Sequence, residues 1–158
     1  MIAKVKVAIA LGANLGDRDK MIRLAAQRLE EDLLEEAKLS NLIETEPWGV
    51  KDQPKFLNAV IVGLTDWKPP AILDYLKSLE RELGRVSTVK NGPRVIDLDL
   101  ICQGEEVWNS AGIEVPHPRM ADRDFVLIPL FEVWPTWCHP IRRKIVTQLL
   151  EDLQGKKD

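Results

Sequence analysis

The stretch FLNAVIVGL, residues 56–64, decides the fold class together with PPAILDYLKSLERELG, residues 69–84. The first segment is rich in β-branched side chains, which predicts a strand. The second begins with two prolines, ends at Gly84 and repeats apolar residues at helical spacing, which predicts a helix with the buried stripe Ile72, Leu73, Leu76, Leu79 and Leu83. Glu80 borders this stripe, where a carboxylate needs a polar partner.

A second strand and helix open the chain. Residues 4–11, KVKVAIAL, alternate large side chains with the small Ala8 and Ala10, which predicts a strand with one large apolar face. A Gly-rich turn follows, and Asp17 is expected to cap a helix that runs to about residue 37. Residues 38–45 alternate weakly and residues 95–102, VIDLDLIC, alternate clearly, so both segments predict strands.

The predicted order is therefore strand, helix, strand, strand, helix, strand. This is the split βαβ order of ferredoxin-like α+β domains, with an antiparallel sheet and helices packed on it. Residues 105–116 predict a hairpin, and Asp122 or Asp124 is expected to cap a helix over residues 125–131, so an extension follows the core. No repeat, linker or low-complexity segment interrupts residues 1–158, which predicts one domain.

Composition limits the classes of function. The 158 residues include 22 Lys and Arg and 25 Asp and Glu, a net charge of −3, which argues against a general polyanion binder such as a nonspecific DNA-binding protein. No apolar run is long enough to span a bilayer and no signal peptide is evident, so we expect a cytoplasmic protein without a membrane partner. The two cysteines, Cys102 and Cys138, are expected to be buried thiols, and the neighbours Cys138 and His139 to form a turn.

The strongest chemical signal is the Asp97-Leu98-Asp99 segment. Residues two apart in a strand face the same side, with Cα atoms roughly 6–7 Å apart, so both carboxylates are expected on one face and Leu98 on the other. Two carboxylates this close repel each other, and a hard divalent cation relieves the repulsion while leaving positions for phosphate oxygens. The segment is consistent with a two-metal phosphoryl-transfer site, although an isolated Asp-x-Asp is more often the polar face of a half-exposed strand that carries two aspartates.

The surroundings of this segment favour the metal site. Residues 85–94 carry three cations and no acid, and His117, Arg119 and Arg123 form a second cationic group. A binding site for a nucleoside triphosphate requires both acids that hold metal and cations that hold phosphate.

Residues 90–101, KNGPRVIDLDLI, resemble the signature of the 6-hydroxymethyl-7,8-dihydropterin pyrophosphokinases. These folate-pathway enzymes move a pyrophosphoryl group from ATP to a pterin alcohol. Residues 5–16, 45–58 and 115–127 resemble further segments of the family, so the resemblance covers essentially the whole chain. The chain departs from the family pattern at three positions, which are Ser87, Asn91 and Pro118.

The resemblance implies an ATP-dependent pyrophosphokinase that releases AMP and uses two Mg²⁺ ions held by Asp97 and Asp99. It implies that Arg85 and Arg94 assist these aspartates in catalysis. The implied pterin-binding residues are Thr45, Glu46, Trp48, Phe56, Asn58 and Phe125. The implied ATP-binding residues are Glu80, Arg94, Leu100, Glu114, His117, Arg119 and Arg123.

Other functions stay open on the residues alone. A noncatalytic ferredoxin-like regulatory module would bind a nucleotide with the cationic residues but without using the acids. A phosphoryl transferase could also act on another small alcohol. The predicted sheet shows no paired surface aromatics of the RNA-binding kind, so we expect no nucleic-acid partner, and we expect a monomer.

Overall fold

A computed structural model describes residues 3–46, 52–84 and 95–157 and is built around one antiparallel sheet. The strands are β1 (Val5–Ala13), β2 (Glu35–Leu39), β3 (Ile43–Thr45), β4 (Phe56–Thr65) and β5 (Asp97–Gln103). Their order is β2-β4-β1-β5, and β3 also pairs with β4. With α1 (Arg18–Asp32) after β1 and α2 (Pro69–Glu82) after β4, this is the ferredoxin-like arrangement, and the predicted fold class is confirmed.

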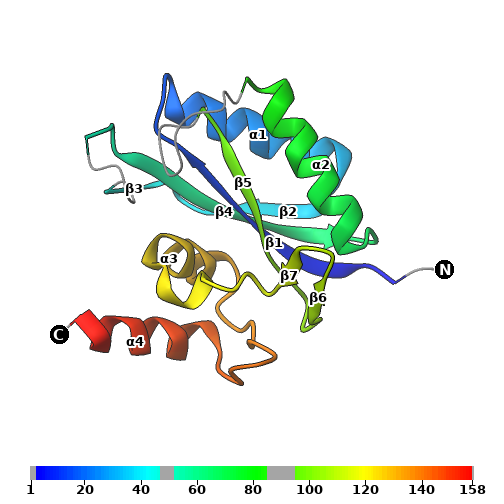
Figure 1. The fold of residues 1–158 in the computed structure, drawn as a ribbon, viewed down its shortest axis with the longest axis vertical. Coiled ribbons are helices and arrows are strands. Elements are labelled where there is room, and N and C mark those ends of the chain that lie inside the picture. Colours follow the sequence, from blue (N-terminus) through cyan, green and yellow to red (C-terminus); the bar gives the residue numbers. More distant parts are fainter. Residues whose placement is uncertain (1–2, 47–51, 85–94, 158) are drawn as a thin grey trace.

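The predicted extension follows β5. It contains the hairpin of β6 (Trp108–Ser110) and β7 (Ile113–Val115), the short 3-10 helix η1 (Met120–Asp122), α3 (Asp124–Val133) and α4 (Val146–Lys157). Figure 1 shows α1 and α2 over one face of the sheet and α3 and α4 over the other. Within the described residues, no helix is both long and apolar enough to cross a membrane.

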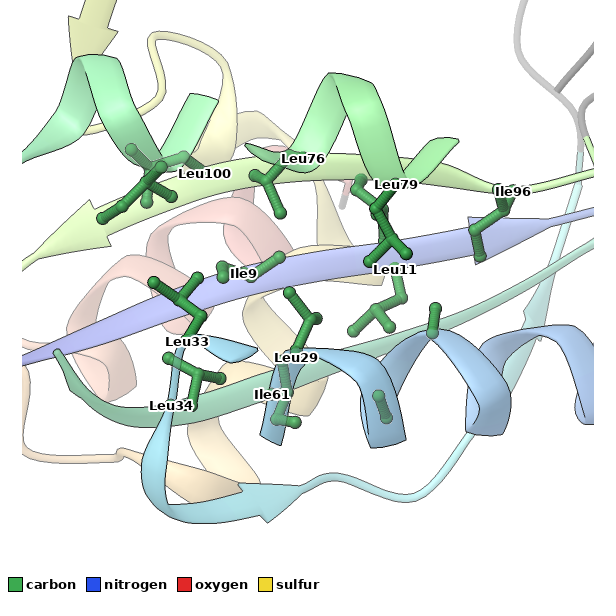
Figure 2. Close-up of a cluster of buried hydrophobic side chains, with 14 of the residues drawn as sticks. Ile9, Leu11, Leu29, Leu33, Leu34, Ile61, Leu76, Leu79, Ile96 and Leu100 are labelled. Carbon is green, nitrogen blue, oxygen red and sulfur yellow. The ribbon is translucent and has the colours of Figure 1, made fainter. Parts of the chain in front are cut away.

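The alternation of β1 separates two buried clusters. Its large side chains, Val7, Ile9 and Leu11, pack against α1 and α2, where Leu29 and Leu76 lie close to them (Figure 2). Its small Ala8 lies on the opposite face with residues of α3 and α4. Fully burying a side chain of the Leu or Ile kind contributes about 1.5–3 kcal/mol, so the large face of β1 anchors the sheet.

The first helix ends earlier than the sequence predicts. Asp17 caps it, because its side chain accepts a hydrogen bond from the Lys20 backbone, but the helix stops at Asp32 instead of residue 37. The following residues leave the helix and pair as β2 with the edge of β4. Pairing along β4 gives these residues backbone partners in the sheet, and this tertiary context overrides the local helical pattern. The predicted strand over residues 38–45 is correspondingly divided into the end of β2 and β3.

Two further expectations of the extension are wrong in detail. Neither Asp122 nor Asp124 caps α3: the N-cap is Arg123, without a side-chain bond, because Asp122 belongs to η1 and Asp124 is already helical. Cys102 is buried as predicted, but Cys138 is only half-buried. His139 does form a turn, since its Nδ1 accepts the backbone N–H groups of Ile141 and Arg142 at 3.2 Å each.

Candidate functional site

Three neighbouring strands bring the predicted polar residues into one row. Gly12 of β1 pairs with Asn58 of β4 on one side and with Asp97 of β5 on the other. Because adjacent strands are about 4.8 Å apart, Asn58 and Asp97 lie roughly 10 Å apart across the glycine. Ala10, two residues back on β1, pairs with Asp99. An amide and two carboxylates therefore border a strip of β1 that has almost no side chain.

The two carboxylates lie on the face that the alternation predicts. Leu98 and Leu100 are buried in the cluster beneath α1 and α2, at 4% and 5% exposure, so Asp97 and Asp99 face the other side and are half-buried. The small residues of β1 lie on this same side. The carboxylates therefore share the face of the sheet on which the small side chains of β1 lie.

The donor set of this pair fits Mg²⁺, which prefers carboxylate, water and phosphate oxygens. No cluster of three or more His, Cys, Asp or Glu side chains suited to a metal occurs within residues 3–46, 52–84 and 95–157. A cation held by Asp97 and Asp99 would therefore share its remaining positions with water and with the oxygens of a bound substrate, which is how Mg²⁺ commonly binds at nucleotide sites.

Gly12 sets the position of the Asn58 amide. A Cβ atom at Gly12 would lie 3.0 Å from Asn58 Oδ1 and 3.9 Å from Cδ1 of Phe56. Asn58 is only 7% exposed, and its Nδ2 donates a 2.6 Å hydrogen bond to the hydroxyl of Thr45 on β3. The missing side chain at Gly12 and the hydroxyl of Thr45 together orient the amide within the row.

The turn after β1 holds the segment that leads into β4. Asn14, which is 1% exposed, donates from Nδ2 to Gln53 Oε1 at 2.8 Å and to the Pro54 carbonyl at 3.0 Å. Arg18 donates to the Lys55 carbonyl at 2.8 Å. Sequence reasoning missed these positioning roles of Gly12 and Asn14. The available signal was the continuation of the small-residue face of β1 from Ala8 and Ala10 into Gly12.

The predicted cationic group beside the carboxylates needs a correction at His117. Its backbone N–H donates to the Ile101 carbonyl of β5 at 2.7 Å, and its Nδ1 accepts the Arg119 N–H at 3.1 Å. Burial, assisted by the positive charges of Arg123 and Arg119, lowers the pKa of His117 to about 4, although Asp97 acts in the opposite direction. His117 is therefore a neutral hydrogen-bonding group at pH 7, and the positive charge comes from the two arginines.

This pKa predicts a pH dependence of stability. Between pH 6.5 and about 4 the unfolded chain binds a proton at His117 while the folded chain does not, so the free energy of unfolding falls as the pH is lowered through this window. We expect His117→Asn to reduce that fall. Urea unfolding of both proteins at pH 7, 5.5 and 4.5 measures the free energy of unfolding. His139 is present in both proteins, so its contribution to the pH dependence is the same in each. Identical pH dependence in the two proteins would contradict the prediction.

The remaining predicted site residues come from several elements. The Arg123 guanidinium lies 5.5 Å from the ring centre of Phe125 on α3. Glu80 is buried and accepts the Leu98 N–H, while the side chain of Leu100 faces the core beneath α1 and α2. Glu46 and Glu114 are exposed, and Glu46 forms an ion pair with Lys55 at 3.4 Å. Trp48, Arg85 and Arg94 lie outside the described residues, as do Ser87 and Asn91.

Comparisons with known proteins agree on one family. The family described as 7,8-dihydro-6-hydroxymethylpterin-pyrophosphokinase matches residues 8–135. A 2-amino-4-hydroxy-6-hydroxymethyldihydropteridine pyrophosphokinase of Aquifex aeolicus is 41% identical over 138 residues, which cover 87% of this chain and 86% of the relative. The match thus includes the glycine, amide and carboxylate row of the sheet.

Other similar proteins are longer than this chain. The folic acid synthesis protein fol1 of Pneumocystis carinii is 39% identical over 147 residues, 93% of this chain but 20% of that protein. The crystal structure of wild-type Plasmodium falciparum HPPK-DHPS superposes with a TM-score of 0.75 at 13% identity and covers 98% of this chain and 45% of that one. The chain thus spans about a fifth of the first protein and less than half of the second, and the structural likeness concerns the fold.

Proposed function

Because the chain belongs to the 7,8-dihydro-6-hydroxymethylpterin-pyrophosphokinase family, we propose that it transfers a pyrophosphoryl group from ATP to the hydroxymethyl group of 6-hydroxymethyl-7,8-dihydropterin in folate biosynthesis. The products are AMP and the pterin pyrophosphate. The observation that carries the proposal is the row of Asn58, Gly12 and Asp97, which sets a group suited to a pterin roughly 10 Å from a group suited to a metal-bound triphosphate.

The pterin lies at the β4 end of the row in this proposal. The Asn58 amide hydrogen-bonds the edge of the ring, and its orientation is maintained by Thr45. Phe56 and Phe125 contact the two faces of the ring, since flat heteroaromatic rings favour offset contacts with aromatic side chains at about 4.5–7 Å. Glu46 and Trp48 complete this end of the site.

The triphosphate lies at the β5 end. Asp97 and Asp99 would hold two Mg²⁺ ions, which would supply neutralisation of phosphate charge and polarisation of the pterin hydroxyl. Arg119 and Arg123 bind phosphate oxygens, with Arg85 and Arg94 from the segment after α2. His117 donates a hydrogen bond from Nε2, because its Nδ1 is already an acceptor. The backbone near Leu100 and Glu114 lies close to the nucleotide in this proposal, whereas the buried Glu80 carboxylate accepts the Leu98 N–H on the other face of the sheet.

Positioning accounts for the rate in this mechanism. The hydroxymethyl oxygen attacks the β-phosphorus in line, and the bond from that phosphorus to the AMP oxygen breaks, so no covalent enzyme intermediate forms. The chain aligns the two substrates and stabilises the charge that develops on the phosphates. No strong general base is assigned.

One incubation tests the function. The protein is mixed with ATP, Mg²⁺ and 6-hydroxymethyl-7,8-dihydropterin, and AMP and the pterin pyrophosphate are quantified by chromatography. We expect both products in equal amounts, and none when the pterin is omitted. Nucleotide binding without AMP formation would favour the noncatalytic regulatory module instead. If AMP formed only with a different alcohol, that alcohol and not the pterin would be the acceptor.

The proposal also includes the setting of the enzyme. We treat residues 1–158 as one domain that acts as a monomer in the cytoplasm, on small-molecule substrates and without nucleic acid. Light scattering measures the oligomeric state, and a dimer would change this part of the proposal without affecting the reaction.

A further inference from the structure

Glu80 is a buried carboxylate on the side of the sheet opposite the candidate site. It belongs to α2, is 5% exposed and accepts a 2.7 Å hydrogen bond at Oε2 from the backbone N–H of Leu98. Leu98 is the residue between Asp97 and Asp99, and its side chain is buried beneath α2. The carboxylate therefore holds the backbone of β5 midway between the two predicted metal ligands.

The bond matters because, among the strands that the structure describes, β5 is at the end of the sheet order and has β1 as its one neighbour in that sheet. Successive backbone N–H groups of a strand point to opposite sides, so the Leu98 N–H points away from β1 while those of its neighbours point towards it. A buried N–H group that lacks a partner is costly. Glu80 supplies the acceptor that a further strand would supply in the middle of a sheet.

We infer that Glu80 is a positioning residue for the Asp97 and Asp99 pair, acting through the Leu98 backbone and not through contact with ATP. The inference rests on the proposed function for what the pair holds. The loss of this bond frees the edge of β5 at Leu98 and changes the spacing of the two carboxylates. Asn58 lies two strands away on β4 and Thr45 lies one strand further on β3, and both keep their geometry.

Three substitutions separate this role from others. Glu80→Leu has a similar volume but accepts no hydrogen bond. Glu80→Gln retains an acceptor oxygen and removes the charge. Glu82→Gln is the matched control, because Glu82 belongs to the same helix, is exposed and pairs with Arg28 at 2.9 Å. Circular dichroism and thermal unfolding establish that each variant is folded.

The first measurements are independent of catalysis. Amide exchange by NMR reports the Leu98 N–H, and we expect its exchange to be about tenfold faster in Glu80→Leu than in the native chain, because its acceptor is lost. Electron paramagnetic resonance reports Mn²⁺ binding in the presence of a nonhydrolysable ATP analogue. Loss of an outer partner of a metal ligand commonly lowers metal affinity about 10–100-fold, and we expect this range for Glu80→Leu.

Activity then completes the test. We expect Glu80→Leu to lower kcat with little change in the KM for the pterin, Glu80→Gln to recover most of that loss because it keeps an acceptor oxygen, and Glu82→Gln to behave like the native chain. Unchanged Leu98 exchange and Mn²⁺ affinity in a folded Glu80→Leu variant would overturn the inference. So would loss of Mn²⁺ binding in Glu80→Gln with normal Leu98 protection, since that pattern assigns the role to charge. If the native chain formed no AMP, the proposed function would fail while the exchange and Mn²⁺ results still decided the role of Glu80.

Discussion

Asp97→Ala and Asp99→Ala are each expected to abolish AMP formation while the fold is retained. Each carboxylate is half-buried and faces away from the large buried cluster, so its removal leaves the packing of Leu98 and Leu100 intact. Removing a single electrostatic contact to a transition state typically lowers kcat by about 10²–10³-fold, and losing a ligand of the predicted metal pair should cost at least that. Single-turnover AMP formation measures the effect.

An exposed acid provides the control for the aspartate variants. Asp74 is on the outer side of α2, and Asp74→Ala is expected to leave the rate unchanged. Isothermal titration with Mn²⁺ and a nonhydrolysable ATP analogue should show weakened metal binding in both aspartate variants. Metal binding in Asp74→Ala should be the same as in the native chain. Full activity in either aspartate variant would remove that residue from the predicted metal site.

The sequence predicts those parts of the site whose information is local. The alternation of residues 95–102 is enough to put both aspartates on one face, because a strand has a fixed period of two and the apolar residues that alternate with them, Ile96, Leu98 and Leu100, must be buried. The apolar stripe of residues 69–84 likewise identifies α2 and shows that Glu80 needs a partner. Which group becomes the hydrogen-bond partner of Glu80 depends on how α2 packs against β5. No local sequence pattern specifies that packing.

Other features depend on pairing between distant segments. The end of α1 at Asp32 is decided by the edge of β4, which lies more than twenty residues further on, so the helical periodicity alone overestimates the helix. The state of His117 is another such case. Its position among arginines suggests a cation, but burial beside those same arginines favours the neutral ring. The register that makes Gly12 the neighbour of both Asn58 and Asp97 is also visible only in the assembled sheet.

Asn58→Ala and Gly12→Ala are expected to weaken pterin binding selectively. Asn58→Ala removes the amide and leaves the Thr45 hydroxyl without the amide bond at 2.6 Å. An unsatisfied buried polar group costs about 1–3 kcal/mol, so we expect the KM for the pterin to rise about 10–100-fold. Gly12→Ala retains the amide but adds a methyl group 3.0 Å from Oδ1, which must move it, and we expect a rise of about tenfold.

The matched control for the glycine variant is Gly155→Ala on α4, where a Cβ atom meets nothing within 4 Å. Steady-state kinetics with each substrate varied in turn should show a normal KM for ATP in all three proteins, because the predicted metal and phosphate contacts come from β5, from residues 85–94 and from the residues after β7. A KM for ATP that rises as much as that for the pterin would mean that the row does not separate the two substrates. An unchanged KM for the pterin in both Asn58→Ala and Gly12→Ala would place the pterin elsewhere on the sheet, since both substitutions alter the Asn58 amide that defines the β4 end of the row.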